Sequence, residues 1–127
     1  MAIRYTTAVE GDTLLVHASG FDESLAEVEE YGLGVIRACQ QVGVTRVLCN
    51  ELELEYRLGT IDTFRAGEFI SEHAPAVTRA AIVCNPKQIA DARFWETVVV
   101  NRGLQVRVFT DTNAAARWLK ESGTVPG

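Results

Sequence analysis

The sequence contains few of the residues that mark secreted, membrane-spanning or nucleic-acid-binding proteins. Its 127 residues include three cysteines, an odd number without CxxC spacing, which is typical of free thiols in a reducing compartment. Lys and Arg total 12 against 17 Asp and Glu, so a chain of net charge -5 lacks the clustered cations that bind nucleic-acid phosphates. No apolar run approaches the ~18 residues of a membrane-spanning helix. The N-terminal MAIRYTTAVEGD is charged and alternating, unlike a signal peptide. We therefore expect a cytoplasmic protein with no nucleic-acid partner and no membrane span.

Motifs for catalysis and for cofactor or metal binding are equally scarce. His17 and His73 have no second ligand at metal spacing. No Ser or Cys lies in a GxSxG nucleophile elbow. The glycines of Gly32-Leu33-Gly34 lie within a helical pattern, whereas a dinucleotide-binding loop follows a strand. Cys49 and Cys84 end predicted strands and are interpreted as buried thiols, with a redox pair as the alternative. We expect no catalytic residue, no cofactor and no metal.

Periodicity and capping signals predict five strands and four helices that alternate along the chain. Strands are expected at residues 3–9, 13–19, 44–49, 80–84 and 104–109. Helices are expected to begin at Ser24, at Thr60, at Asn85-Pro86 and at Asp111 or Thr112. The first two strands are separated by a turn and form a hairpin, with Gly20 ending the second. This order predicts a single α/β domain over residues 1–127: a mixed five-stranded sheet with an antiparallel leading hairpin.

The C-terminal third carries a resemblance to a known family. It reads RAAIVCNPKQIADARFWETVVVNRGLQVRVFTDTNAAARWL: a strand, an Asn-Pro-capped helix, an Asn-Arg-Gly turn, a strand and a last helix. This resembles the STAS domains of anti-sigma factor antagonists, and most closely their bacterial SpoIIAA-like branch, which is also grouped with Sec14-like lipid-binding folds. The resemblance implies a regulatory protein-interaction module with a phosphorylatable Ser or Thr where the second helix begins. That site reads roughly Asp-Ser-Ser-Gly in the antagonists. The present chain has no such sequence, and Thr60 is the nearest positional match.

The segment from Glu51 to Tyr56 alternates three carboxylates with three large apolar residues. In an extended chain Leu52, Leu54 and Tyr56 share one face and the glutamates share the other. We interpret the segment as an edge strand or arm whose apolar face covers either its own core or a twin subunit. The glutamates would then guard the edge against aggregation. A metal site, paired acid–base carboxylates and a lid over a ligand are the alternatives.

Polar residues that follow the predicted strands mark the edge where a ligand is expected. Open α/β sheets bind ligands at the carboxyl ends of their strands. That edge includes Asn50, Glu51, Asn85 and Asp111. Thr60 lies at the same edge, as the cap of the second helix or as a phosphorylation site, because a helix N-terminus favours a phosphate.

Two functions remain open from the sequence. The first is a non-enzymatic regulatory module that forms a homodimer and binds an unidentified protein, as the resemblance implies. The second is a carrier of a small molecule or lipid, with Leu52, Leu54 and Tyr56 lining a pocket.

Overall fold

The five strands form one mixed sheet in which sheet order equals chain order. The computed structural model describes residues 2–75 and 78–121. The strands are β1 (Ile3–Glu10), β2 (Thr13–Phe21), β3 (Arg46–Glu55), β4 (Arg79–Cys84) and β5 (Gln105–Phe109). They lie in the order β1-β2-β3-β4-β5, with β1 antiparallel to β2 and the other pairs parallel. The predicted mixed sheet with an antiparallel leading hairpin is confirmed.

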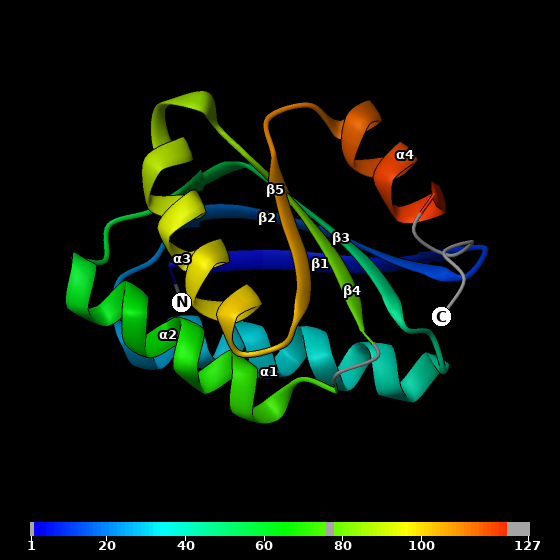
Figure 1. Ribbon diagram of the computed structural model, residues 1–127, viewed down its shortest axis with the longest axis horizontal. Helices are drawn as coiled ribbons and strands as arrows, with labels where there is room; N and C mark the ends of the chain where they lie inside the picture. Colours follow the sequence, from blue (N-terminus) through cyan, green and yellow to red (C-terminus); the bar gives the residue numbers. More distant parts are fainter. Residues whose placement is uncertain (1, 76–77, 122–127) are drawn as a thin grey trace.

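Four α-helices cover the sheet unequally. They are α1 (Leu25–Val42), α2 (Thr60–His73), α3 (Ile89–Asn101) and α4 (Thr112–Glu121), with a short 3-10 turn, η1 (Pro86–Gln88), before α3. The helices α1, α2 and α3 each connect two neighbouring parallel strands. Because such crossovers are right-handed and the sheet advances in one direction, all three lie on the same face. No strand follows α4 in the described chain, and it packs on the opposite face against β3, β4 and β5 (Figure 1).

Local sequence signals account for most of the helix and strand boundaries. The Ser24 side chain accepts a hydrogen bond from the Glu27 N–H, and Gly43 ends α1 with φ of 74°. Asn85 caps η1 by accepting from the Lys87 N–H. The expected break at Gly20 is wrong, because β2 continues to Phe21. There Gly20 adopts φ of +95°, and a Cβ on it would lie 2.0 Å from the Ala2 carbonyl oxygen, so only glycine fits the strand.

The start of α2 differs from the expected cap. Gly59 is the N-cap residue and makes no side-chain hydrogen bond, while Thr60 is the exposed first residue of the helix. The hydroxyl of Thr63 instead donates to the Gly59 carbonyl oxygen at 2.9 Å. The prediction of Thr60 as the helix cap is therefore wrong by one residue.

Each face of the sheet has its own hydrophobic core. On the face of α1, α2 and α3 the core includes Val16, Cys49, Val99 and Val106. On the face of α4 a smaller core is formed by Leu48, Ala81, Val83, Ala115 and Leu119. None of the helices in the described part of the chain is both long enough and apolar enough to cross a membrane.

Candidate functional site

The unusual alternating segment belongs to the central strand of the sheet. The strand expected at residues 44–49 continues to Glu55. It pairs with β2 as far as Glu55, whereas β4 pairs with it only as far as Glu51, so the residues after Glu51 have a strand on one side only. The interpretation as a free arm is therefore wrong. Its physical cause is that β2 also extends to Phe21 and pairs with the second half of β3.

A β-bulge in β3 changes which side chains of the segment point to each face of the sheet. The pairing with β2 runs from His17 opposite Asn50 to Ser19 opposite Glu53. Two residues of β3, Glu51 and Leu52, thus lie opposite a single residue of β2. A bulge adds one residue to one strand and so reverses the alternation of the side chains beyond it.

Because of the bulge, Leu52 and Leu54 do not lie on the same face of the sheet, although the alternation in the sequence predicts that they do. Leu52 packs with the core beneath α4, whereas Leu54 is 4% exposed in the core beneath the other three helices. Glu51 falls on the same side as Leu54 and is 7% exposed. Glu53 lies at the surface, where its Oε1 atom is 2.9 Å from Nε2 of His17. One of the three glutamates is therefore an interior residue, which the simple alternation did not predict.

The Glu51 carboxyl group is held by two tyrosines from different elements. The Tyr31 hydroxyl of α1 donates to Glu51 Oε2 at 2.8 Å, and the Tyr56 hydroxyl donates to Oε1 at 2.5 Å. Burial raises the pKa of Glu51 above its ordinary value, although both tyrosine hydrogen bonds act to lower it. The neighbouring carboxylate of Asp22 raises it further. Glu51 therefore has an environment that disfavours negative charge.

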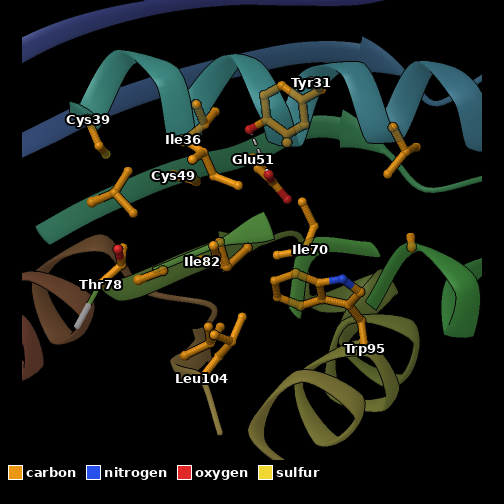
Figure 2. Close-up of a pocket in the computed structure, with 18 of the residues that line it drawn as sticks. Tyr31, Ile36, Cys39, Cys49, Glu51, Ile70, Thr78, Ile82, Trp95 and Leu104 are labelled. Atoms are coloured by element: carbon orange, nitrogen blue, oxygen red, sulfur yellow. Dashed lines mark hydrogen bonds between the residues drawn. The ribbon is translucent and has the colours of Figure 1, made fainter. Parts of the chain in front are cut away.

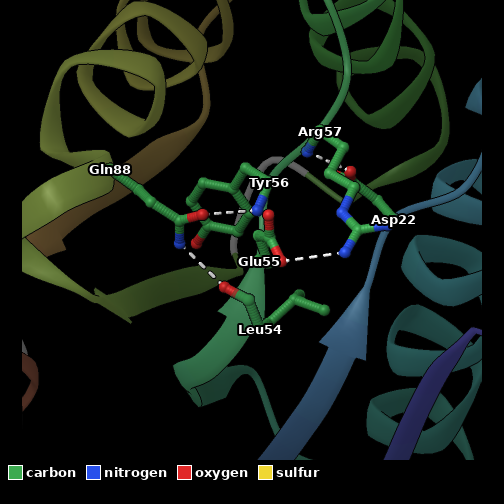
Figure 3. Close-up of polar contacts among 6 residues, drawn as sticks. All are labelled: Asp22, Leu54, Glu55, Tyr56, Arg57 and Gln88. Atoms are coloured by element: carbon green, nitrogen blue, oxygen red, sulfur yellow. Dashed lines mark hydrogen bonds and ion pairs between the residues drawn. The ribbon is translucent and has the colours of Figure 1, made fainter.

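Asp22 is the second buried carboxyl group of this region. It follows β2, is 6% exposed, and accepts a hydrogen bond from the Arg57 N–H. Burial raises its pKa, and the backbone hydrogen bond from Arg57 opposes that rise. The Arg57 guanidinium lies 3.8 Å from the centre of the Phe21 ring and pairs with Glu55 at 3.0 Å. Figure 3 shows the contacts of Arg57 with Asp22 and with Glu55, the last residue of β3.

The chain after β3 is also fixed to the turn before α3. Gln88 donates from Nε2 to the Leu54 carbonyl oxygen at 2.8 Å and accepts from the Tyr56 N–H at 2.6 Å (Figure 3). This paired contact satisfies backbone groups of Leu54 and Tyr56 that no neighbouring strand reaches. It places the Tyr56 side chain where its hydroxyl meets Glu51.

A large cavity lies between the sheet and the helices α1, α2 and α3. Its volume is about 420 Å³. Its wall extends from Asp22 and Glu51 at the carboxyl ends of β2 and β3 to Gln40 and Thr45 near the opposite edge. At about 3.3 Å per strand residue, the distance along β3 from Thr45 to Glu51 is roughly 20 Å. Most of the wall is apolar, as with Val35, Ile36, Ile70, Ile82, Leu104 and Val106 (Figure 2).

The residues expected at the ligand edge separate into two groups. Asn50, Asn85 and Asp111 accept hydrogen bonds from the backbone N–H groups of Leu52, Lys87 and Ala114, so their side chains shape turns and helix starts. Glu51 alone of the four lines the cavity. The residues expected at an interface or lid are also divided: Leu54 and Tyr56 line the cavity and Leu52 lies on the other face.

Sequence reasoning missed Tyr31 and Asp22. Tyr31 occupies a helix position one turn before Val35, on the buried stripe of α1, and its helical spacing was a usable signal. Asp22 carried no signal, since an acidic residue before a capped helix is ordinarily exposed. Within residues 2–75 and 78–121, no group of three or more His, Cys, Asp or Glu is arranged to hold a metal ion.

Comparison with known proteins identifies the fold. No protein-family model and no curated protein sequence matches the chain. Among solved structures, an anti-sigma factor antagonist from Mycobacterium paratuberculosis is similar with a TM-score of 0.63 and 12% identity, over 93% of this chain and 94% of that one. An uncharacterized protein from Shewanella loihica with a SpoIIAA-like fold has a TM-score of 0.52 and 20% identity, over 93% and 94% of the two chains. The unphosphorylated anti-sigma factor antagonist SpoIIAA has a TM-score of 0.54 and 16% identity, over 97% and 100%. The chain therefore has the STAS-like, SpoIIAA-like fold that its C-terminal third resembles.

Proposed function

We propose that this protein binds a small, largely apolar molecule in the cavity beneath its sheet, as a carrier or sensor rather than as an enzyme. The cavity itself is the observation that carries the proposal. Its volume of about 420 Å³ falls within the range of roughly 300–1,000 Å³ that is common for ligand sites. Its wall combines many apolar side chains with a few polar groups at one end, which is the usual composition of such sites.

The packing of the cavity wall supports the same function. Apolar side chains that face water lack the dispersion contacts of a closed core. A bound apolar molecule supplies those contacts and removes apolar surface from water.

Native mass spectrometry of the protein purified from its own host tests this function. We expect a stoichiometric mass increment that organic extraction removes. The extracted protein should then bind an environment-sensitive apolar dye, and Trp95, which lines the cavity, supplies a fluorescence signal. In Ala92→Leu, which narrows the cavity, both the increment and the dye binding should weaken. A folded protein that carries no increment and binds no dye would contradict the proposal.

A regulatory protein-interaction module is the second candidate. The similarity in fold to two anti-sigma factor antagonists favours it. So does the first part of α2, where Ile61 is 69% exposed and Phe64 is 37% exposed beside the exposed Thr60. Two large apolar side chains next to a hydroxyl at a helix N-terminus suit a protein contact that a phosphate alters, because a phosphate there adds negative charge.

Phosphorylation of Thr60 is tested in the same mass spectrum. A phosphate-sized increment that disappears in Thr60→Ala but persists in Thr97→Ala would support this candidate. Thr97 is an exposed threonine on α3 and serves as the control. An increment that survives in Thr60→Ala, or none in protein from the native host, counts against the switch.

Homodimer formation is part of this second candidate. Leu54 is buried in its own chain, so of the three expected interface residues only Leu52 and Tyr56, both half-buried, retain exposed area. Sedimentation equilibrium should give twice the chain mass, and Leu52→Ser should lower that value. A monomer at micromolar concentration would contradict the homodimer.

A further inference from the structure

The ionisable side chains along the cavity wall have one sign of charge. Asp22, Glu51 and Asp91 line the cavity. Among the described residues that line it, there is no Lys, Arg or His. Two buried carboxyl groups, Asp22 and Glu51, and the exposed Asp91 thus line a cavity without a cationic side chain on its described wall, although ligand sites for acids ordinarily supply a cation or a cluster of N–H donors.

The hydrogen bonds of Glu51 leave room for about two more donors. Each of its carboxylate oxygens accepts one tyrosine hydroxyl, at 2.8 Å from Tyr31 and 2.5 Å from Tyr56. A carboxylate offers about four acceptor positions, so about two remain unused by these contacts. In this geometry both hydroxyl protons point at Glu51, and neither is available for a ligand. The polar end of the cavity is therefore an acceptor site.

We propose that the cavity binds an apolar amine, with its protonated nitrogen beside Glu51 and its apolar body extending toward Thr45. The assignment rests on the function proposed above and names the chemical class of the molecule. An ammonium group has three donors and no acceptor, which complements a carboxylate whose partners already donate. Asp22 is a second acidic group at the same end of the cavity.

The surroundings of Glu51 strengthen the preference for a cation. Burial and the nearby Asp22 carboxylate raise the pKa of Glu51, so the negative charge of this group lacks full compensation in the protein. A protonated amine supplies a cation inside the protein, where charge pairs are screened less than in water. Tyr31, Tyr56 and Trp95 also line the cavity, and aromatic faces attract cations.

The same geometry disfavours anionic ligands such as fatty acids. A ligand carboxylate would be a third acidic group beside Glu51 and Asp22, and no cationic side chain on the described wall offsets the repulsion. A neutral alcohol avoids the repulsion and can donate one hydrogen bond to Glu51, but it forms no ion pair with it. The expected order of affinity is therefore amine, then alcohol, then acid.

Three probes with the same alkyl chain test this order: octylamine, octanol and octanoate. Binding to the extracted protein is measured near neutral pH by calorimetry and by Trp95 fluorescence. We expect octylamine to bind about tenfold or more tightly than octanol, and octanoate to bind most weakly. Glu51→Gln should remove most of the preference for octylamine over octanol. Glu30→Gln, an exposed change of equal charge on α1, should retain the preference.

The outcomes separate the ligand class from the proposed function. Equal binding of the three probes, or tighter binding of octanoate, overturns the amine assignment while the cavity function stands. An amine preference that survives in Glu51→Gln also overturns the assignment. Failure of all three probes to bind a protein shown to be folded by circular dichroism contradicts both. The ranking in the wild-type protein decides the question even where Glu51→Gln does not fold.

Discussion

The two faces of the sheet differ in how completely their covering helices fill the space. Three helices cover one face and enclose a cavity of about 420 Å³, whereas α4 alone packs on the other face. The α4 face brings Ala81, Val83, Ala115 and Leu119 together at 3% exposure or less. Both buried acidic side chains of the described chain, Asp22 and Glu51, line the cavity. Both cores therefore contain fully buried side chains, and only the face of α1, α2 and α3 combines them with buried carboxyl groups beside a cavity.

The largest expected effect is a difference between two leucine truncations. Leu119 on the α4 face is 3% exposed, and Leu54 beside the cavity is 4% exposed. Leu119→Ala should lower the free energy of unfolding by about 4 kcal/mol and Leu54→Ala by about 2 kcal/mol, because a side chain next to a void has fewer contacts to lose. Urea unfolding of both variants measures the difference. Equal losses of unfolding free energy would mean that the two faces do not differ in packing.

Replacing one buried alanine on each face with leucine should change the free energy of unfolding by an intermediate amount. Ala115→Leu adds volume to the closely packed α4 face and should cost about 1–3 kcal/mol in unfolding free energy. Ala92→Leu adds the same volume beside the cavity and should change stability by less than about 1 kcal/mol. Thermal unfolding compares the two, with ligand binding as a second readout for Ala92→Leu. A larger loss for Ala92→Leu would mean that the cavity cannot accept the added volume.

The smallest expected effect is on how the free energy of unfolding depends on pH. It tests the buried carboxyl groups that distinguish the cavity face from the α4 face. The pKa of Glu51 is raised above its ordinary value of 4.5 in the folded state. Above pH 4.5 the folded state thus holds a proton that the unfolded state releases. The free energy of unfolding then falls as pH rises, until the folded-state pKa is passed. One such group contributes at most about 1.4 kcal/mol per pH unit.

Glu51→Gln should reduce this slope, and Asp22, whose pKa burial also raises, should account for part of what remains. Urea unfolding between about pH 5 and pH 8 measures the slope in each protein. Glu30→Gln, which changes an exposed carboxylate, should keep the wild-type slope. An unchanged slope in Glu51→Gln would show that this carboxyl group does not govern the pH dependence.

The architecture was predictable because its signals are local. The hairpin, the crossover order and the cap at Ser24 each depend on residues close together in the chain, and the structure places them as expected. Asn85 caps the 3-10 turn η1, and α3 itself begins four residues later, at Ile89. The cap at Thr60 failed by one residue, since Gly59 also fits a helix N-cap and has no side chain to signal it. Element boundaries of this kind vary by a residue or two even between assignments of one structure.

The site was largely hidden from sequence reasoning for two physical reasons. The bulge at Glu51 and Leu52 is set by pairing with β2, more than thirty residues earlier. The alternation of residues within β3 alone therefore places the side chains beyond the bulge on the wrong face of the sheet. The cavity is a volume left between side chains of a sheet and three helices, and no single element encodes it. The pairing of Glu51 with Tyr31 joins residues on different elements for the same reason.

The sheet order β1-β2-β3-β4-β5 also has a consequence for synthesis. Each strand that leaves the ribosome finds its only earlier neighbour already made, and folding can proceed from the N-terminal edge. The cavity wall, however, includes Trp95 of α3 and Val106 of β5. It cannot close until those residues have left the ribosome. Until then, the part of the chain already made exposes the apolar side chains that later line the cavity.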